Sequence, residues 1–219
     1  MKNADLHGNV PDHSDVALLL IDVINDVDFP ESEEFLAHAL PAAQNIAKLT
    51  QQARSLGIPL IYVNDNFGKW QSNFQAQLQH CLRPESKGRP IAELLKPKPD
   101  DYFVLKPKHS AFYSTSLDIL LRYLRAETLI ITGFAGNICV LFTASDAYMR
   151  DFELFVPADC IASNTESENS YALSQMSKIL KADVRKSLEL DLQKVIRDAH
   201  NRRTSGTHVH VQNCSAFTS

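Results

Sequence analysis

Several features that mark common classes of protein are scarce in this chain of 219 residues. Four cysteines at irregular spacing are too few for a disulfide framework and form no CxxC metal motif: Cys81, Cys139, Cys160 and Cys214. The formal net charge of −4 gives no support for nucleic-acid binding. No apolar run approaches the roughly 18 residues of a membrane span, and the first residues lack the apolar core of a signal peptide. We therefore expect a cytoplasmic protein with no nucleic-acid or membrane partner.

Glycine is also scarce, with 7 residues in the chain, and no GxGxxG pattern follows any predicted strand. A dinucleotide-binding domain normally carries that pattern where its first strand turns into a helix. The segment Gly133-Phe-Ala-Gly136 does not match it. The sequence therefore argues against a nucleotide-binding Rossmann protein.

What the chain does contain is a regular alternation of apolar strands and helical patterns. Its 44% of hydrophobic residues suffice for a substantial core. Predicted strands cover 16–22, 58–64, 101–106, 128–132 and 153–158, and predicted helices cover 41–56, 116–126, 137–150, 168–180 and 183–199. Pro41 suits the first turn of its helix. This alternation predicts an α/β fold with three layers, a doubly wound and mostly parallel sheet between helices.

We expect residues 1–200 to form a single domain and residues 201–219 to form a flexible C-terminal tail. Within the domain, residues 65–90 are rich in Asn, Gln, Arg and Pro and show little periodicity. Long irregular insertions of this kind are typical of loops that cover a site or form an interface. We therefore expect this segment to be a lid or a subunit contact.

Polar residues follow the predicted strands at the points where ligands bind in open α/β sheets. The first strand ends at Asp22, the second at Asn64, the third at Lys106 with Lys108 nearby, and the fourth leads to Cys139. Asp22 directly follows six apolar residues, and a buried carboxylate needs a cationic partner, for which Lys106 is best placed. A carboxylate, an amine and a thiol on one edge are what a covalent hydrolase needs.

Cys139 lies where the strand 128–132 turns into a helix. A helix N-terminus presents free N–H groups and positive potential, which tend to lower a thiol pKa and can hold an oxyanion. The alternative interpretation is a small, buried and inert cysteine. A redox-sensing thiol is a further alternative, and it would require Cys160 as its resolving partner.

Three segments in fixed order carry a family resemblance. The first is Asp22-Val-Ile-Asn25-Asp26 after an apolar strand, the second is Lys106-Pro-Lys-His-Ser110-Ala-Phe112 with a following Thr115, and the third runs from Gly133 through Cys139 to Ala147. Together they resemble the isochorismatase-like cysteine hydrolases, which include nicotinamidases, N-carbamoylsarcosine amidases and isochorismatases. The resemblance covers residues 16–163, most of the chain.

The resemblance implies roles for particular residues. It makes Cys139 the nucleophile, Asp22 the proton acceptor and donor, and Lys106 the third member of a catalytic triad. Lys106 is selected over Lys108 because the family's lysine precedes the Ser-Ala-Phe serine by four positions. It also implies a cis peptide bond between Phe134 and Ala135, and an oxyanion hole formed by the backbone N–H groups of Ala135 and Cys139.

The chain departs from the family pattern at several positions. Ile24 and Val27 stand where Gln and Phe are usual, and Asn64-Asp65-Asn66 replaces the Asp-x-His element of the nicotinamidase metal cluster. We therefore expect no metal and no cofactor, although Asp65 could contact a cation. Residues expected to line the substrate pocket are Asn25, Asn64, Phe67, Trp70, Phe112 and Phe134.

These features predict a hydrolase that cleaves the C–N bond of a small amide or carbamoyl compound through an acyl-enzyme on Cys139. One alternative is vinyl-ether hydrolysis of the isochorismatase type, with Asp22 as general acid and no need for a thiol. Another is a non-catalytic binding protein of the same fold, against which the complete triad counts. Because the family usually forms dimers or tetramers, we expect a homodimer or homotetramer.

Overall fold

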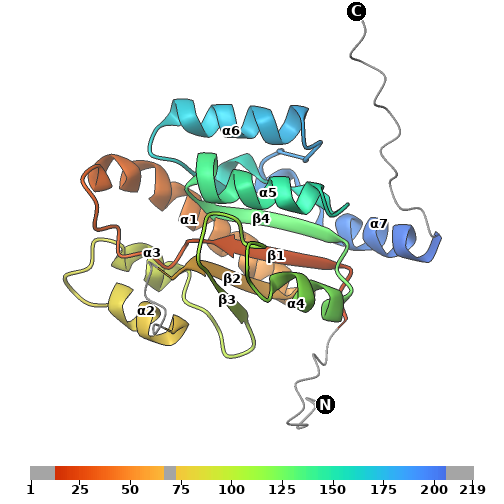
Figure 1. The fold of residues 1–219 in the computed structure, drawn as a ribbon, viewed down its shortest axis with the longest axis horizontal. Helices are drawn as coiled ribbons and strands as arrows, with labels where there is room; N and C mark the ends of the chain where they lie inside the picture. Colours follow the sequence, from red (N-terminus) through yellow and green to blue (C-terminus); the bar gives the residue numbers. More distant parts are fainter. Residues whose placement is uncertain (1–12, 67–72, 206–219) are drawn as a thin grey trace, which may run out of the picture.

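A single parallel sheet forms the centre of the computed structural model, which describes residues 13–66 and 73–205 (Figure 1). Its strands are β1 (Val16–Ile21), β2 (Leu60–Asp65), β3 (Tyr102–Lys106), β4 (Thr128–Phe134), β5 (Glu153–Phe155) and β6 (Ile161–Ala162). The strand order is β3-β2-β1-β4-β5, β6 pairs with β4, and each of these pairings is parallel. The predicted α/β fold with a mostly parallel sheet is confirmed.

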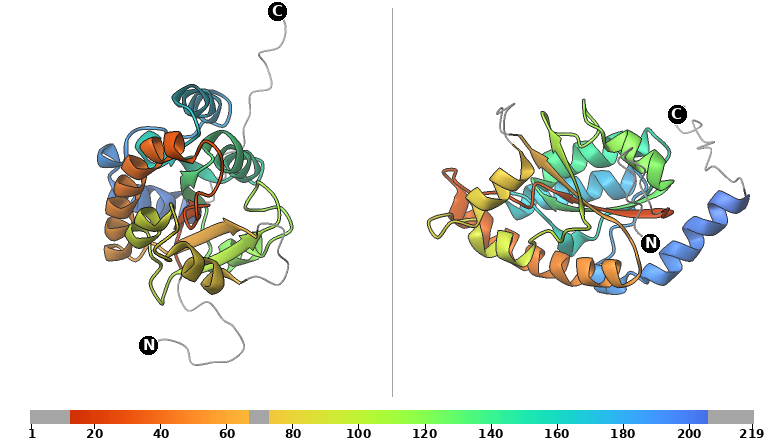
Figure 2. Two further views of the ribbon diagram at one scale, coloured as in Figure 1. Left: turned by 90° about the vertical axis from the view of Figure 1, so that its left-hand side faces the viewer. Right: turned by 90° about the horizontal axis from the view of Figure 1, so that it is seen from below.

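Helices cover both faces of this sheet. They are α1 (Ser32–Ser55), α2 (Phe74–Cys81), α3 (Arg89–Leu94), α4 (Leu117–Leu124), α5 (Leu141–Tyr148), α6 (Glu166–Lys178) and α7 (Leu192–Ser205). Apolar residues of α1, α2, α3 and α7 pack on one face, and those of α4, α5 and α6 pack on the other (Figure 2). Burial on both faces explains why β1 is a continuous apolar run. No helix within the described residues has the length and apolar composition needed to cross a membrane.

The winding of the sheet reverses between β1 and β4. From β1 the chain proceeds outward to β2 and β3, then crosses back to β4 on the other side of β1. Ile21 is in register with Gly133 there, and a Cβ added to Gly133 would lie 2.1 Å from the carbonyl oxygen of Ile21. Only glycine permits this approach of the two backbones, which opens onto the crevice where doubly wound folds bind their ligands.

Helix α1 begins at Ser32, so the prediction that Pro41 occupies a first helical turn is wrong. Pro41 lies inside the helix, where it donates no backbone hydrogen bond. The helix continues because Phe35 and Ala39, which precede Pro41 by six and two residues, are buried in the core. Packing against the core outweighs the local penalty of the proline.

Within the predicted irregular segment 65–90, the described residues from 73 onward are more regular than predicted, because they contain α2 and the start of α3. Phe74, Leu78 and Cys81 pack into the core at helical spacing, and the Asn73 side chain caps α2 by accepting a hydrogen bond from the Ala76 N–H at 2.7 Å. The lid or interface role of this segment remains a prediction.

The C-terminal elements also differ from the prediction for 183–199. Helix α7 begins only at Leu192, because Asp183 instead forms a parallel bridge with Phe155 beside the sheet. The helix then continues to Ser205, so residues 201–205 are helical rather than part of a tail. The rest of the expected tail, 206–219, lies outside the described residues.

Candidate active site

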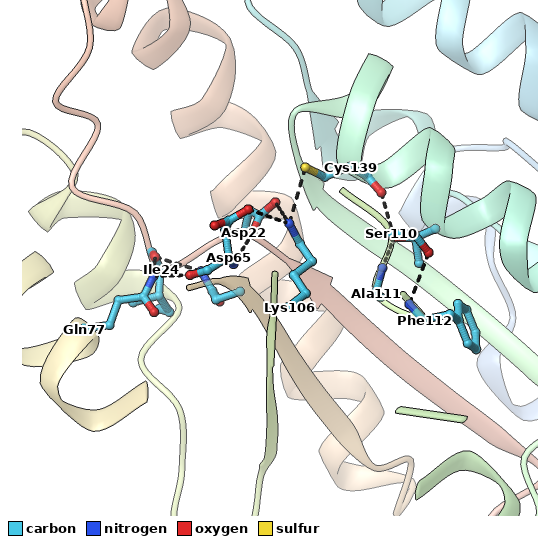
Figure 3. A network of polar contacts seen from close by, with 11 residues as sticks. Asp22, Ile24, Asp65, Gln77, Lys106, Ser110, Ala111, Phe112 and Cys139 are labelled. Atoms are coloured by element: carbon cyan, nitrogen blue, oxygen red, sulfur yellow. Dashed lines mark hydrogen bonds and ion pairs between the residues drawn. The ribbon is translucent and has the colours of Figure 1, made fainter. Parts of the chain in front are cut away.

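Three side chains from different strand ends meet at the carboxyl edge of the sheet (Figure 3). The Nζ of Lys106 lies 3.0 Å from Oδ2 of Asp22 and 3.5 Å from Sγ of Cys139. Lys106 is 0% exposed, and Asp22 and Cys139 are each 7% exposed. The structure therefore brings together the three residues predicted to form the triad, with the ammonium between the carboxylate and the sulfur. Lys108, the alternative lysine, is exposed.

Two left-handed residues turn the chain at the strand ends that flank the crevice. Asp22 directly follows β1 with φ of 53°, and Ala135 directly follows β4 with φ of 52°. Such conformations cost a non-glycine residue about 1–3 kcal/mol and often occur at functional sites. The described residues contain no cis peptide bond, so the expected cis bond between Phe134 and Ala135 is wrong. The left-handed Ala135 makes the turn instead.

Cys139 lies in a short π-helix, Gly136–Val140, that precedes α5. The Val140 N–H donates to the Ala135 carbonyl at 3.3 Å, and the Asn137 N–H donates to Ser163 Oγ at 3.1 Å. These two donors are therefore engaged within the fold. The oxyanion-hole role of the Ala135 and Cys139 N–H groups remains a prediction.

Gly136 is required by packing rather than by flexibility. A Cβ added there would lie 2.7 Å from Oδ1 of Asn169 and 2.8 Å from Oγ of Ser163. These polar groups belong to α6 and to the segment before it, and they hydrogen-bond to each other at 3.1 Å. The glycine therefore lets the Cys139 turn pack closely against this part of the fold.

The thiol pKa differs from what a helix N-terminus predicts. Burial, and then the negative charge of Asp22, raise the pKa of Cys139 to about 12, while Lys106 acts in the opposite direction. Burial also opposes the charge of Lys106, but the neighbouring Asp22, Cys139 and Asp65 outweigh it and raise the pKa of the lysine. The resting site therefore holds a neutral thiol beside a stable ammonium, and the thiol must lose its proton as it attacks.

Cys160 does not support the redox-sensing alternative. It is a buried free cysteine like Cys139, but the two residues pack into hydrophobic clusters on opposite faces of the sheet. Burial also raises the pKa of Cys160 to about 12. The structure therefore does not present it as a resolving thiol for Cys139.

Asp65 supplies a second carboxylate to Lys106, with Oδ2 3.5 Å from Nζ. Its backbone N–H also donates to Oδ1 of Asp22 at 2.8 Å. Asp65 ends β2 in register with Lys106 of β3, so the pairing follows from the parallel alignment of the two strands. The cation that Asp65 contacts is thus Lys106, the lysine of the predicted triad, and sequence reasoning did not find this contact.

The Ser-Ala-Phe element in the loop after Lys106 is hydrogen-bonded to side chains of α5, the helix that directly follows the Cys139 turn. The Ala111 N–H donates to Thr143 Oγ1 at 3.0 Å, and this hydroxyl donates to the Cys139 carbonyl at 2.7 Å (Figure 3). The Ser110 hydroxyl donates to the Asp146 carboxylate on the same helix. Sequence reasoning missed Thr143, whose only signal is its position four residues after Cys139.

Gln77 of α2 lies close to Ile24, the position at which the resembled family usually has glutamine. Its Nε2 donates to the carbonyl oxygens of Ile24 and Asp65, each at 3.3 Å. The Ile24 side chain is buried in the core. Helix α2 is therefore tied to the ends of both β1 and β2 at the edge that carries Asp22.

The two asparagines predicted to line the pocket stabilise the strand ends. Asn25 Oδ1 accepts from the Val27 N–H at 2.7 Å and closes the turn after β1. Asn64 Nδ2 donates to the Ile24 carbonyl at 2.8 Å, whereas its buried Oδ1 has no hydrogen-bond partner among the described residues. A contact between either residue and a substrate remains a prediction.

The predicted aromatic residues pack against other side chains of the fold where they are described. Phe112 packs against Phe152 and beneath the Arg150 guanidinium, and its ring points away from Lys106 and Cys139 (Figure 3). Phe134 packs edge-on against Phe35 in the core. Phe67 and Trp70 lie outside the described residues.

The chain is similar in sequence and in fold to known proteins. The family model described as the isochorismatase domain matches residues 16–185. The chain belongs to the isochorismatase family. The isochorismatase family protein YaaI of Bacillus subtilis (strain 168) is 44% identical over 171 residues, which cover 78% of this chain and 93% of that protein.

Other relatives differ in the reaction that their names give. An isochorismatase of Bacillus subtilis (strain 168) is 32% identical over 75% of this chain, which spans about half of that protein, 53%. The N-carbamoylsarcosine amidase of Thermoplasma acidophilum has a similar solved structure, with a TM-score of 0.60 and 26% identity, covering 80% of this chain and 98% of that one. The chain is thus an isochorismatase-family hydrolase.

Proposed function

We propose that this hydrolase cleaves a C–N bond in an amide or carbamoyl group of a small molecule, with Cys139 as its nucleophile. The observation that carries the proposal is the contact of Sγ with a buried ammonium at 3.5 Å, which is itself paired with a carboxylate at 3.0 Å. This arrangement provides a nucleophile, a proton acceptor and a fixed positive charge. The similarity to an N-carbamoylsarcosine amidase supports the same class of bond.

The reaction begins when Asp22 accepts the thiol proton as sulfur attacks the carbonyl carbon. The raised pKa of Lys106 keeps its ammonium charged, so that it stabilises the forming thiolate. Negative charge passes to the carbonyl oxygen, for which the N–H groups of Ala135 and Cys139 are the expected donors. Asp22 then gives the proton to the leaving nitrogen, the C–N bond breaks and the amine departs.

A thioester on Cys139 remains after the amine has left. Water attacks its carbonyl carbon while Asp22 accepts a proton from the water. The C–S bond breaks, the acid product leaves, and the proton returns from Asp22 to the sulfur. One water is consumed in each cycle, and the enzyme returns to its starting state.

The similarity to an isochorismatase favours vinyl-ether hydrolysis as the second candidate. That reaction requires Asp22 to protonate the substrate, but it requires no nucleophilic thiol. The two candidates therefore differ in their dependence on Cys139.

The test is a panel of small primary amides, N-carbamoyl compounds and isochorismate, assayed for ammonia or for vinyl-ether cleavage. The variant is Cys139→Ala, and the matched control is Cys160→Ala, which removes a buried free cysteine from the opposite face of the sheet. We expect Cys139→Ala to lower amide turnover by at least about a thousandfold, as loss of a nucleophile does, and the control to retain it. Amide turnover that survives in Cys139→Ala would refute the proposal, and thiol-independent turnover of isochorismate would establish the alternative.

A further inference from the structure

The charges at the catalytic edge differ in sign and in their access to solvent. The ammonium of Lys106 is 0% exposed, whereas the side chain of Asp65 is 30% exposed and that of Asp22 is 10% exposed. A molecule that enters from solvent therefore meets carboxylate oxygen before it meets the ammonium. Among the described residues in contact with Lys106, the accessible charge is therefore negative.

The exposed carboxylate lies close to the reacting sulfur. Asp65 Oδ2 and Cys139 Sγ are each 3.5 Å from the same Nζ, so they are at most twice that distance apart. The same ammonium also contacts Asp22, whose Oδ2 lies 3.0 Å from Nζ. With a neutral thiol, two carboxylates share one positive charge, and the triad together with Asp65 carries a net negative charge.

The positive charge of Lys106 is therefore already neutralised before a substrate arrives. Among the described residues, other ionisable side chains lie near the same strand ends: Asp26, which is paired with His80 at 2.9 Å, and the exposed Lys108 with its neighbour His109. Asp65 differs from these four because its carboxylate contacts the triad itself.

We propose that Asp65 makes this site select uncharged or cationic amides and disfavour substrates that carry a carboxylate near the scissile bond. The inference rests on the proposed function, because it assumes that substrates approach Cys139 from this edge. A negative group within several ångströms of the Asp65 carboxylate is repelled, and Lys106 has no free charge with which to compensate it. For partly exposed charges this repulsion lowers the rate by about five- to thirtyfold.

The test compares two alkylating agents of nearly equal size, neutral iodoacetamide and anionic iodoacetate. The rate of modification at Cys139 is measured by peptide mass spectrometry, and each rate is divided by the rate of the same reagent with N-acetylcysteine. In the wild-type protein we expect the normalised iodoacetate rate to be lower by at least about fivefold. Asp65→Asn should reduce this difference to about twofold or less, because it removes one negative charge and keeps the backbone N–H that binds Asp22.

The matched control is Asp26→Asn, which removes a carboxylate that follows β1 at the same edge without touching Lys106. We expect this variant to retain the wild-type difference between the two reagents. Equal or faster modification by iodoacetate in the wild type would overturn the inference. So would a difference that persists unchanged in Asp65→Asn.

A measurement on the wild-type protein covers the case in which Asp65→Asn does not fold. The difference between the reagents should narrow as the salt concentration rises from about 0.02 to about 0.5 M, since salt screens partly exposed charges, and a difference independent of salt would overturn the inference. Failure of both reagents to modify Cys139 would contradict the proposed function. Modification without charge preference would contradict this inference alone.

Discussion

Replacement of Asp22 by Asn separates the two effects that this carboxylate has on Cys139. Its negative charge helps to raise the pKa of the thiol to about 12, and in the proposed reaction it also accepts the thiol proton. Asp22→Asn should therefore abolish hydrolysis and at the same time make the thiol easier to ionise. We expect amide turnover to be lost while the alkylation of Cys139 by iodoacetamide becomes faster.

The size of the second effect follows from the electrostatics of the site. A like charge beside an ionisable group changes its pKa by about 1 to 3, so without the Asp22 charge the thiolate fraction at pH 8 rises by about 10- to 1000-fold. Nucleophilicity falls as the pKa falls, with a Brønsted coefficient of about 0.5. The net increase in the alkylation rate at pH 8 is therefore about 3- to 30-fold.

The assay measures modification of Cys139 from pH 6 to 10, beside ammonia release from any amide that the wild type hydrolyses. Cys160 in the same samples serves as an internal control, because its environment does not include Asp22. Alkylation that slows together with turnover in Asp22→Asn would contradict an inhibitory effect of the Asp22 charge on ionisation of the thiol. That result would mean that Asp22 promotes ionisation of the thiol in the resting enzyme.

Further predictions concern single side chains. Lys106→Met leaves two carboxylates without their cation, so we expect slower alkylation of the Cys139 thiol at pH 8. The free energy of unfolding, measured with denaturant, should fall by about 3–5 kcal/mol. Unchanged alkylation rates would contradict the electrostatic role of Lys106. Thr143→Val should slow the alkylation of Cys139 and lower the free energy of unfolding by about 1–3 kcal/mol. Thr143→Ser keeps the hydroxyl and should match the wild type. Equal behaviour of the two variants would show that the hydroxyl is dispensable. Gly133→Ala brings a Cβ against the β1 backbone at a residue with positive φ, so we expect the free energy of unfolding to fall by about 3 kcal/mol or more. A variant with the melting temperature of the wild type would argue against that contact. The pKa values of Cys81 and Cys160 are raised to about 12 by burial, so the unfolded chain loses these thiol protons near pH 9 while the folded chain keeps them. The free energy of unfolding should therefore fall from about pH 9 to 12, and less steeply in Cys81→Ala; equal slopes would contradict this.

The convergence of the triad could be predicted from the order of residues along the chain. Carboxyl ends of parallel strands meet at one edge of a sheet, so Asp22, Lys106 and Cys139 had to lie near one another once the strands were assigned. The contact between Asp65 and Lys106 required more information. It depends on β2 and β3 being neighbours with those two residues in register, and a single sequence does not state that alignment.

Properties that depend on burial and packing were the least predictable from sequence. The position of Cys139 after β4 suggested a lowered pKa, but the sequence does not show how far the surrounding side chains exclude water, and this exclusion decides the sign. Helix α2 was missed because Phe74 and Leu78 stand among polar residues that resemble a loop. The hydroxyl of Thr143 became visible as a link only when both of its partners were placed.

In the proposed reaction Cys139 carries an acyl group, which rapid acid quenching followed by intact-mass and peptide analysis would detect. During turnover of an amide substrate, we expect an added mass equal to the acyl part of the substrate, located on Cys139 and released by hydroxylamine. The same adduct should be absent in Cys139→Ala and present in Cys160→Ala. Two results together would contradict an acyl-enzyme on Cys139. They are steady turnover with no adduct on Cys139, at quench times that span many turnovers, and activity that is retained in Cys139→Ala.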